Sequence, residues 1–223
     1  MNILTTELFD LTKSISEPLL SNCKYPWEAL PKIKDFILKI GPQLNQDEYD
    51  YLGDDVWVGK NVSIHPSAVI HGPVIVGSGT EIRPSAFIRG SVIIGCGCVI
   101  GNSCELKNAI IFDKVQIPHF NYIGDSIMGF SSHTGAGAIT SNVKSDRSLV
   151  TVNCNNEKIN TGLKKFGAIL GDYVEIGCNS VLNPGTIIGK HTNVYPLSSV
   201  RGAIPPNSIY KSQNNIVKKR QNN

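Results

Sequence analysis

Aliphatic residues recur every six positions along two long stretches of this chain. One stretch begins near residue 54 and the other near residue 168, and two residues before each aliphatic position comes another apolar or small residue. A period of six fits neither an amphipathic helix nor a simple alternating strand over this length. The aliphatic positions are Val58, Ile64, Ile70, Val76, Ile82, Ile88, Ile94, Ile100, Leu106, Leu170, Ile176, Leu182, Ile188, Val194 and Val200.

The period of six predicts a β-solenoid, in which each group of six residues forms one side and turns a corner. Three groups close a triangular coil of about 18 residues, and successive coils stack about 4.8 Å apart through strand hydrogen bonds. The aliphatic positions then fill the interior. The sequence therefore predicts a mainly β fold over residues 51–210.

Residues 1–50 carry a helical pattern instead. Ile33, Phe36, Ile37 and Ile40 fall at helical spacing, and Gly41 is a plausible stop. We expect a small N-terminal helical cap on the first coil, where it would cover the open end of the solenoid.

Two further segments depart from the period. Residues 141–165 fit no group of six, so we expect a projecting loop, and long loops in compact domains are often functional. Residues 211–223 form a basic tail with Lys218, Lys219 and Arg220. We expect this tail to be a solvated, disordered end rather than a contact to a ligand.

Composition narrows the class of protein. The chain has 223 residues and a formal net charge of +3. It lacks the basic face with interleaved aromatic residues that indicates nucleic-acid binding, and no apolar run approaches the roughly 18 residues of a membrane span. The first residues include acidic side chains and no apolar core of signal length, so we expect a cytoplasmic protein with neither nucleic acid nor membrane as a partner.

Three cysteines cluster in CGCVIGNSC, residues 96–104. Thiolates bind zinc, but no second pair of ligands follows at zinc spacing. We interpret Cys98 and Cys104 as small interior residues of the repeat.

Stacking of the coils predicts a column of basic side chains. Arg89 follows Ile88 and Lys107 follows Leu106, 18 residues later, so the two cations should lie one above the other. Lys165 falls in the same slot if the second stretch extends back by one group. Close cations repel each other unless an anion or water lies between them, and a phosphate suits both Arg and Lys. The column therefore indicates either a phosphorylated ligand or two side chains that simply reach into water.

The segment IPHFNYIGDSIMGFSSHTGAGAIT, residues 117–140, breaks the aliphatic rhythm. It combines His119, Tyr122 and His133 with a glycine-rich run beside the expected loop. Histidine titrates near neutrality and often accepts a proton in catalysis. A lone histidine is more often structural, but these surroundings favour a functional role.

The stretches PHFNYIGD, HTGAGAITSN and KKFGAILGDYVEIGCNSVLNPGTIIGKHT resemble a known family. They are similar to the acetyltransferase domain of bifunctional N-acetylglucosamine-1-phosphate uridyltransferases. The segment TGLKKFGAILGD looks closest to the archaeal sugar-1-phosphate nucleotidyltransferase/acetyltransferases. The resemblance covers about residues 54–205 and implies a left-handed parallel β-helix of hexapeptide repeats. The left hand of the helix comes from the resemblance, since the six-residue period alone does not fix it.

The resemblance also implies roles for individual residues. His119 falls on the catalytic base of the family and Glu105 on a carboxylate that assists it. The positions that the resemblance assigns to the sugar phosphate, the substrate amine and the acetyl-CoA cofactor are Arg89, Lys107, Tyr122, His133, Asn142, Lys165, Ala136, Cys178 and Pro196.

Three positions depart from the bacterial pattern, and so does the start of the chain. His133 stands where Asn is usual, Val143 where Tyr is usual and Cys178 where Ser is usual. These changes bear on which sugar is bound. Nothing before residue 54 resembles the nucleotidyltransferase signature, so we expect this chain not to make a nucleotide sugar.

Together these observations predict an enzyme that transfers acetyl from acetyl-CoA to the amine of a hexosamine phosphate such as glucosamine 1-phosphate. The resemblance implies a homotrimer with CoA between subunits, and the activated thioester requires no metal. Two alternatives from other classes stay open: a non-catalytic trimeric scaffold or sugar-phosphate sensor, and a metal-dependent lyase such as the γ-type carbonic anhydrases. His65 and His71 are six residues apart and so on different sides, which argues against the lyase. Transfer to a nucleotide-linked amino sugar is a further variant.

Overall fold

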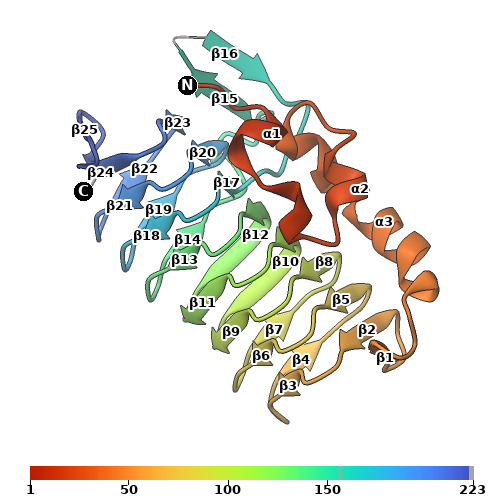
Figure 1. The fold of residues 1–223 in the computed structure, drawn as a ribbon. Coiled ribbons are helices and arrows are strands. Elements are labelled where there is room, and N and C mark those ends of the chain that lie inside the picture. Colours follow the sequence, from red (N-terminus) through yellow and green to blue (C-terminus); the bar gives the residue numbers. More distant parts are fainter. Residues whose placement is uncertain (156, 221–223) are drawn as a thin grey trace.

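The computed structural model describes residues 1–155 and 157–220. Its main body is a left-handed parallel β-helix of about nine turns, accompanied by a few short helices (Figure 1). Strands that pair with one another come from successive turns, and they are parallel throughout the solenoid. The mainly β solenoid predicted from the six-residue period is confirmed.

The prism has three sides, which we call the covered side, the open side and the third side. The covered side lies beneath the N-terminal segment. It consists of β2 (Val56–Gly59), β5 (Val74–Val76), β8 (Val92–Ile94), the ends of β10 (Glu105–Ile111) and β12 (Tyr122–Met128), then β17 (Ala168–Leu170), β20 (Thr186–Ile188) and β23 (Ala203–Ile204).

The open side bears exposed apolar residues such as Val69 and Ile139. It consists of β4 (Val69–Ile70), β7 (Phe87–Ile88), the starts of β10 and β12, β14 (Ile139–Thr140), β19 (Val181–Leu182) and β22 (Ser199–Val200). The third side consists of β3 (Ser63–Ile64), β6 (Glu81–Ile82), β9 (Val99–Asn102), β11 (Gln116–His119), β13 (His133–Thr134), β18 (Glu175–Ile176), β21 (Asn193–Val194) and β24 (Ser208–Ser212).

The coils are not all of one length. β2, β5 and β8 pair at intervals of 18 residues, whereas β8, β10 and β12 pair at intervals of 17. β12 pairs with β17 across 42 residues, because the insertion lies between these strands. The strict six-residue period is therefore broken between Leu106 and the second aliphatic stretch.

Many corners contain a residue in the left-handed conformation. On the corner between the third side and the open side, Phe120 has φ 53° and Leu197 has φ 60°. Bulky residues rarely adopt this conformation, which glycine and asparagine accept readily. The stacked coils impose it here, since the same corner is left-handed at Ser85, Ser103, Gly137 and Asn179 as well.

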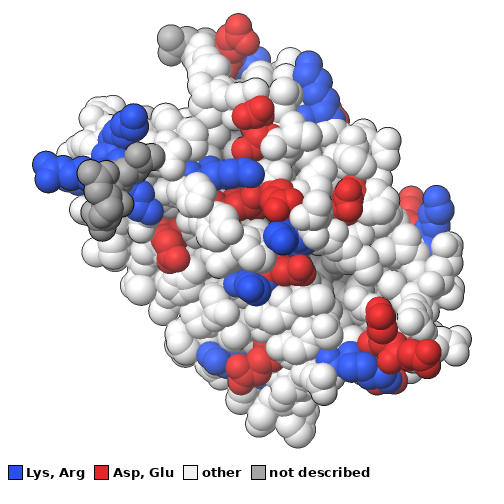
Figure 2. Space-filling model, in the orientation of Figure 1, with Lys and Arg blue, Asp and Glu red and all other residues white. Residues whose placement is uncertain are grey.

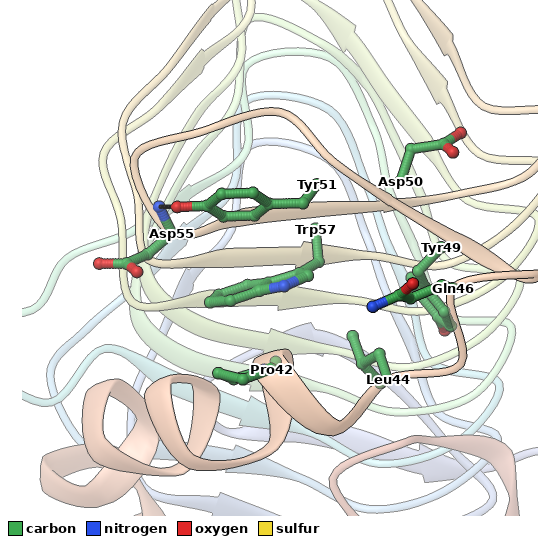
Figure 3. Close-up of a pocket in the computed structure, with 9 residues that line it drawn as sticks. Pro42, Leu44, Gln46, Tyr49, Asp50, Tyr51, Asp55 and Trp57 are labelled. Atoms are coloured by element: carbon green, nitrogen blue, oxygen red, sulfur yellow. Dashed lines mark hydrogen bonds between the residues drawn. The ribbon is translucent and has the colours of Figure 1, made fainter.

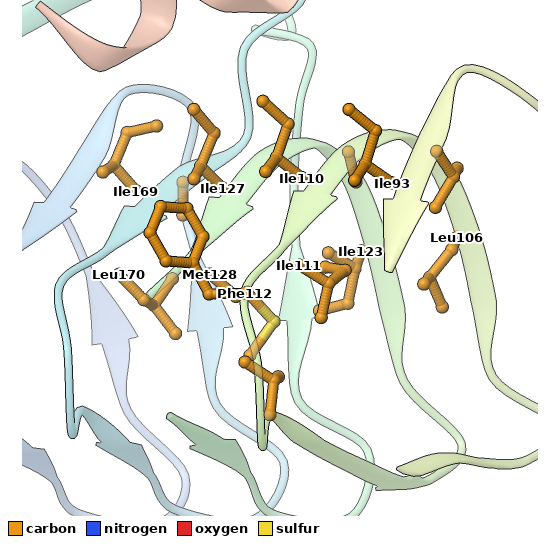
Figure 4. Close-up of a cluster of buried hydrophobic side chains, with 14 of the residues drawn as sticks. Ile93, Leu106, Ile110, Ile111, Phe112, Ile123, Ile127, Met128, Ile169 and Leu170 are labelled. Carbon is orange, nitrogen blue, oxygen red and sulfur yellow. The ribbon is translucent and has the colours of Figure 1, made fainter. Parts of the chain in front are cut away.

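The aliphatic side chains form two buried rows. Leu106, Ile111 and Ile123 lie inside the prism, whereas Ile93 and Ile110 project from the outer face of the covered side, in a row with Ile127 and Ile169 (Figure 4). All of them are at most 1% exposed. Burial of one such side chain contributes about 1.5–3 kcal/mol. The outer row needs a cover, because water would otherwise contact it.

The N-terminal segment supplies this cover, which corrects the expectation of a cap on the first coil. It runs lengthwise along the covered side, and α3 contacts β8 and β10 (Figure 1). Ile33 and Ile37 of α3 are fully buried. The segment consists of α1 (Thr5–Leu8), the 3-10 helix η1 (Leu11–Lys13), α2 (Glu17–Leu20), η2 (Pro26–Lys32), α3 (Ile33–Ile40), η3 (Gly41–Gln43) and β1 (Tyr49–Tyr51), which pairs antiparallel with β2.

Two aspartates hold the segment at the edge of the prism. The N–H of Asp172 donates to the carbonyl of Leu8 at 3.1 Å, and its Oδ2 accepts from the N–H of Asp10 at 2.8 Å. The N–H of Asp113 donates to the carbonyl of Lys13 at 3.1 Å. These contacts tie the segment to two separate coils.

Asparagine at position 113 should stabilise the protein at neutral pH. Burial raises the pKa of the Asp113 carboxyl in the folded chain, so its ionised form costs stability, and this cost disappears as pH falls through the folded pKa. In the wild type the Cys96 N–H donates to Oδ1 of Asp113 at 2.8 Å. Asp113→Asn keeps an oxygen acceptor for this N–H and removes the charge. We expect the Tm to rise by roughly 1–3 °C at pH 7.5 and to match the wild type near pH 4. Thermal melts at both pH values check this, with surface Asp47→Asn as the control; a lower Tm at pH 7.5 would contradict it.

The insertion and the tail are more ordered than the sequence predicts. Within the expected loop, β15 (Thr151–Cys154) and β16 (Glu157–Asn160) form an antiparallel hairpin, and Val150 and Val152 are fully buried. In the tail, β25 (Asn215–Lys218) pairs antiparallel with β24, so the expectation of a disordered end is wrong as far as residue 220; residues 221–223 lie outside the described part. No helix in the described ranges has the length and apolar character needed to cross a membrane.

Candidate active site

Two corners of the prism border the open side, and the candidate residues gather on them. The corner between the third side and the open side, which we call the histidine corner, carries Asn102, His119, Ala136, Cys178 and Pro196. Backbone hydrogen bonds link its coils in sequence: the N–H of Phe120 donates to Asn102, that of Gly137 to His119, that of Asn179 to Ala136 and that of Leu197 to Cys178, at 2.8–3.0 Å.

The corner between the open side and the covered side, which we call the basic corner, carries Arg89, Lys107, Asp125 and Asn142. The N–H of Arg89 donates to the carbonyl of Leu106, and Lys107 pairs with Gly124 in the parallel strands. Arg89 and Lys107 therefore occupy adjacent coils on one edge, as the stacking argument predicts. Glu105 and Tyr122 lie between the two corners and are in register in β10 and β12.

The buried side chain of Asn121 links His119 to the glycine-rich run. Its Oδ1 accepts from the N–H of His119 at 3.2 Å. Its Nδ2 donates to the carbonyls of Gly135 at 2.8 Å and Ala138 at 3.1 Å. The His119 backbone and the next coil are thus held together, while the His119 side chain remains exposed. Sequence reasoning missed this residue.

Two backbone donors on the histidine corner are unused. Within residues 1–155 and 157–220, no protein acceptor takes the N–H of Ala136 or that of Cys178, although the carbonyls of both residues accept hydrogen bonds. The two residues occupy successive coils above His119. The corner therefore offers two stacked N–H groups to a ligand oxygen.

Glu105 hydrogen-bonds Arg89 in this structure. Its Oε1 accepts from Arg89 Nη1 at 2.6 Å, and among the described residues it makes no hydrogen bond to His119. The Glu105 charge raises the pKa of Arg89, first through this hydrogen bond and then through Coulomb attraction. Both side chains are well exposed, 45% for Arg89 and 35% for Glu105. Exposed ion pairs are weak, so Arg89 can exchange this partner for another anion.

Asp125 organises the basic corner, and sequence reasoning did not identify it. Its side chain is 5% exposed and accepts from Lys107 Nζ at 3.1 Å, from Asn108 Nδ2 at 2.9 Å and from Asn142 Nδ2. A signal was available, because Asp125 follows Lys107 by 18 residues, the expected length of one coil. Lys107 thus has a fixed, buried counterion, unlike Arg89.

Tyr122 and Lys165 adjoin this network. The hydroxyl of Tyr122 accepts from Asn142 Nδ2 at 3.2 Å. Burial, and secondly the negative charge of Asp125, raise the pKa of the Tyr122 phenol, so it stays a protonated donor at neutral pH. Lys165 is exposed and immediately precedes Phe166, whose N–H donates to the carbonyl of Asn142 at 2.9 Å.

His133 lies apart from these residues within one chain. It belongs to β13 on the third side, and its Nδ1 is 2.8 Å from Oε2 of Glu175 in the next coil.

Val143, at the start of the insertion, is 43% exposed. Cys98 and Cys104 are 1% exposed, and burial raises the pKa of the Cys98 thiol to about 12. Within the described ranges, no three His, Cys, Asp or Glu side chains converge as a metal site would need.

Charges of both signs are interspersed over the face shown in Figure 2, and no wide basic area appears on that face. At the basic corner, Arg89 pairs with Glu105 and Lys107 pairs with Asp125, so the nearby Lys165 adds one net positive charge. This balance suits a small anion rather than a polyanion.

Several curated proteins are similar to this chain. It is 33% identical over 107 residues to a bifunctional sugar-1-phosphate nucleotidylyltransferase/acetyltransferase of Sulfurisphaera tokodaii, which covers 48% of the chain and 27% of that protein. It is 37% identical over 117 residues to the bifunctional protein GlmU of Methanococcus vannielii, which covers 52% of the chain and 28% of that protein. The chain therefore spans little more than a quarter of these relatives' lengths.

A relative of similar size matches over most of its length. YaiX of Escherichia coli K12, described as an uncharacterized acetyltransferase, is 34% identical over 173 residues, which cover 78% of this chain and 74% of YaiX. Among solved structures, AntD, an N-acyltransferase from Bacillus cereus in complex with dTDP and coenzyme A, aligns at 20% identity with a TM-score of 0.42 over 78% of this chain and 91% of that one.

A family model also matches, and it spans most of the solenoid. The match covers residues 70–217 and is to the GMPPB C-terminal domain. It includes both corners that border the open side, whereas the N-terminal segment and the first coil precede it. The resemblance to the acetyltransferase domains of sugar-1-phosphate nucleotidyltransferases, noted in the sequence, is confirmed. The chain thus belongs to the family of GMPPB C-terminal domains, hexapeptide-repeat solenoids related to those acetyltransferase domains.

Proposed function

We propose that this protein is an acetyl-CoA-dependent N-acetyltransferase that acts on the amine of a hexosamine phosphate, with glucosamine 1-phosphate as the first candidate. The observation that carries the proposal is the pair of corners beside the open side. One offers an exposed imidazole and two free N–H groups, and the other offers exposed cations. The names of the relatives, which combine sugar-1-phosphate nucleotidyltransferase and acetyltransferase activities, support the same chemistry.

His119 would act as the general base. The amine nitrogen attacks the thioester carbonyl carbon and gives its proton to the imidazole. As the tetrahedral intermediate collapses, the carbon–sulfur bond breaks, and the imidazolium returns the proton to the departing CoA sulfur. The exposed ring of His119 leaves both nitrogens accessible, and its backbone is fixed by Asn121.

The free N–H groups of Ala136 and Cys178 would bind oxygen atoms of the acetyl donor. An N–H that already points at the carbonyl oxygen stabilises the negative charge that develops there and needs no reorganisation. Ala136, in the coil next to His119, would serve the thioester carbonyl. Cys178 and Pro196, one and two coils further on, would line the path of the pantetheine arm.

Arg89 and Lys165 would bind the phosphate, with Lys107 behind them. Arg89 gives up a weak exposed partner, whereas Lys107 keeps the buried carboxylate of Asp125. Release of Glu105 from Arg89 would free this carboxylate to favour the imidazolium of His119. Asn142 and Tyr122 would then orient the sugar near its amine.

We further propose a homotrimer with acetyl-CoA between subunits. Apolar side chains lie exposed along the open side and the histidine corner, among them Phe120 at 62% and Leu197 at 80%. A neighbouring prism placed there would cover them and exclude water from the thioester. His133, which lies on the third side, would reach a site only in a neighbouring subunit.

The proposal is tested by incubating the wild-type protein with acetyl-CoA and a panel of acceptors. The panel contains glucosamine 1-phosphate, glucosamine 6-phosphate, galactosamine 1-phosphate, glucosamine and a nucleotide-linked amino sugar. We expect release of CoA thiol and an N-acetylated product, seen by mass spectrometry, with an amino-sugar phosphate. If only the nucleotide-linked sugar reacted, the acceptor would be a nucleotide-linked amino sugar rather than a hexosamine phosphate. If no acceptor led to release of CoA, a non-catalytic sensor would be favoured.

A further inference from the structure

A cavity of about 550 Å³ lies at the first coil. Its lining residue Asp55 is about two coils from Arg89 along the prism. The cavity opens between η3, the residues that follow η3 and the β1–β2 hairpin. Its lining includes Pro42, Leu44, Gln46, Tyr51, Asp55 and Trp57 (Figure 3). All of these residues precede residue 70, so the cavity lies outside the segment that matches the family model.

Aromatic rings form one wall of this cavity. The rings of Tyr51 and Trp57 lie 5.4 Å apart between centroids, with an interplanar angle of 37°. Tyr51 is 60% exposed, whereas Trp57 is 7% exposed. A Cβ atom at Gly41 would approach the indole to 2.6 Å, so the absence of a side chain there lets η3 close against Trp57.

The Tyr51 hydroxyl accepts from the backbone N–H of Asp55 at 3.5 Å, whereas other polar side-chain groups at this wall have no hydrogen-bond partner among the described residues. No hydrogen bond within the described ranges uses the indole N–H of Trp57, and Figure 3 shows this nitrogen on the side of the ring that faces Leu44 and Gln46. The Gln46 amide and the Asp55 carboxylate likewise accept or donate no side-chain hydrogen bond in the described part of the chain. Trp57 is thus a buried residue whose only polar atom turns toward the cavity.

The charge of the lining disfavours anionic ligands. Asp50 and Asp55 line the cavity, and no Lys or Arg does so. Asp50 pairs with Lys60 at the rim, which leaves Asp55 as the free charge. Carboxylates repel phosphate, so this cavity differs in its chemistry from the basic corner.

We propose that this cavity binds an uncharged pyranose unit of a saccharide. An exposed aromatic ring packs against the C–H face of a sugar ring, while the polar group of a Tyr or Trp side chain can hydrogen-bond the sugar. The indole N–H donates to a ring or hydroxyl oxygen, the Asp55 carboxylate accepts from hydroxyls, and the Gln46 amide does both. This inference stands independently of acetyl transfer, because the cavity residues named here have no role in the proposed acetyl transfer.

The two tryptophans of the chain allow a direct test by NMR. Trp27 is 2% exposed and packs against Tyr25 and Phe166, whereas Trp57 lines the cavity. Each gives one indole N–H resonance, and Trp57→Phe assigns them. Titration of the full chain with methyl glucoside, methyl mannoside or N-acetylglucosamine should shift the Trp57 resonance alone for at least one sugar, with a Kd of roughly 1–10 mM.

Variants separate this site from the basic corner. Tyr51→Ala, an exposed change, should weaken binding at least about tenfold, whereas Arg89→Ala should leave it unchanged. Glucose 1-phosphate should bind the wild type more weakly than methyl glucoside, and Asp55→Asn should narrow that gap. Asp55 has φ 57°, a conformation that asparagine tolerates well.

Three results would overturn the inference. These are no shift of the Trp57 resonance with any sugar at about 50 mM, a Kd that Tyr51→Ala leaves unchanged, and equal binding of the phosphorylated and unphosphorylated sugars. Loss of acetyl transfer in corner variants would leave this test untouched, so failure of one proposal is distinguishable from failure of the other.

Discussion

Alanine at position 119 is expected to lower kcat for acetyl transfer by about 10²- to 10⁴-fold, because the attacking amine then loses the base that accepts its proton. The side chain is exposed and its backbone contact to Asn121 does not involve the ring, so the fold should persist. Steady-state release of CoA thiol measures the effect. Binding of acetyl-CoA, measured by calorimetry, should change little.

His65→Ala is the matched control for this prediction. His65 is exposed on the same corner, in a coil nearer the start of the solenoid, and its N–H donates to the backbone of Ile82 at 2.9 Å. Among the described residues its ring hydrogen-bonds Ser67 alone, so its loss should leave kcat within about twofold. Equal loss of activity in the two variants, or full activity in His119→Ala, would remove His119 from the role of base.

Leucine at position 125 is expected to reduce kcat/KM for a phosphorylated acceptor by roughly 100-fold, because Lys107 and Asn142 then lose their common anchor. The change should also lower stability by about 1–3 kcal/mol, since the donors of Lys107, Asn108 and Asn142 are left partly buried without an acceptor. Leucine must also adopt the left-handed φ of 48° at this position, which adds to the loss. Denaturant unfolding and steady-state kinetics measure the two effects separately.

The double variant Asp125→Leu with Lys107→Met separates the kinetic effect of losing Asp125 from its effect on the stability of the fold. Replacing both partners of a buried pair with apolar residues often restores stability. We expect the double variant to unfold nearer the wild type and yet to keep the kinetic defect. If restored stability brought back full activity and the preference for a phosphorylated acceptor, neither Asp125 nor Lys107 would position the acceptor.

The sequence predicted the solenoid because its interior tolerates little variation. Positions such as Ile88 and Leu106 must be apolar in every coil, and Thr80, Ala86 and Cys98 must be small beside them. The adjacency of Arg89 and Lys107 followed from the same spacing. A periodic structure thus converts sequence distance into spatial distance.

The remaining features depend on contacts that carry no period. Coils of 17 residues between β8 and β12 shift the spacing by one, so the pairing of Lys107 with Gly124 could not be read from multiples of six. The N-terminal segment covers one side because Ile93, Ile110 and Ile127 project outward there, and the six-residue series does not include these positions. Glu105 was expected beside His119, and its hydrogen bond to Arg89 depends on side-chain conformations that spacing does not specify.

Phosphate selectivity tests the central claim most directly. The claim is that stacking of the coils builds an anion-binding corner beside a catalytic imidazole. The measurement is the ratio of kcat/KM for glucosamine 1-phosphate to that for glucosamine, in the wild type and in Arg89→Ala. We predict a wild-type ratio of at least about 100, which corresponds to roughly 2.7 kcal/mol of binding energy spent on orientation, and a ratio reduced at least tenfold in the variant. A ratio near one in the wild type, or a ratio that Arg89→Ala leaves unchanged, would contradict this account.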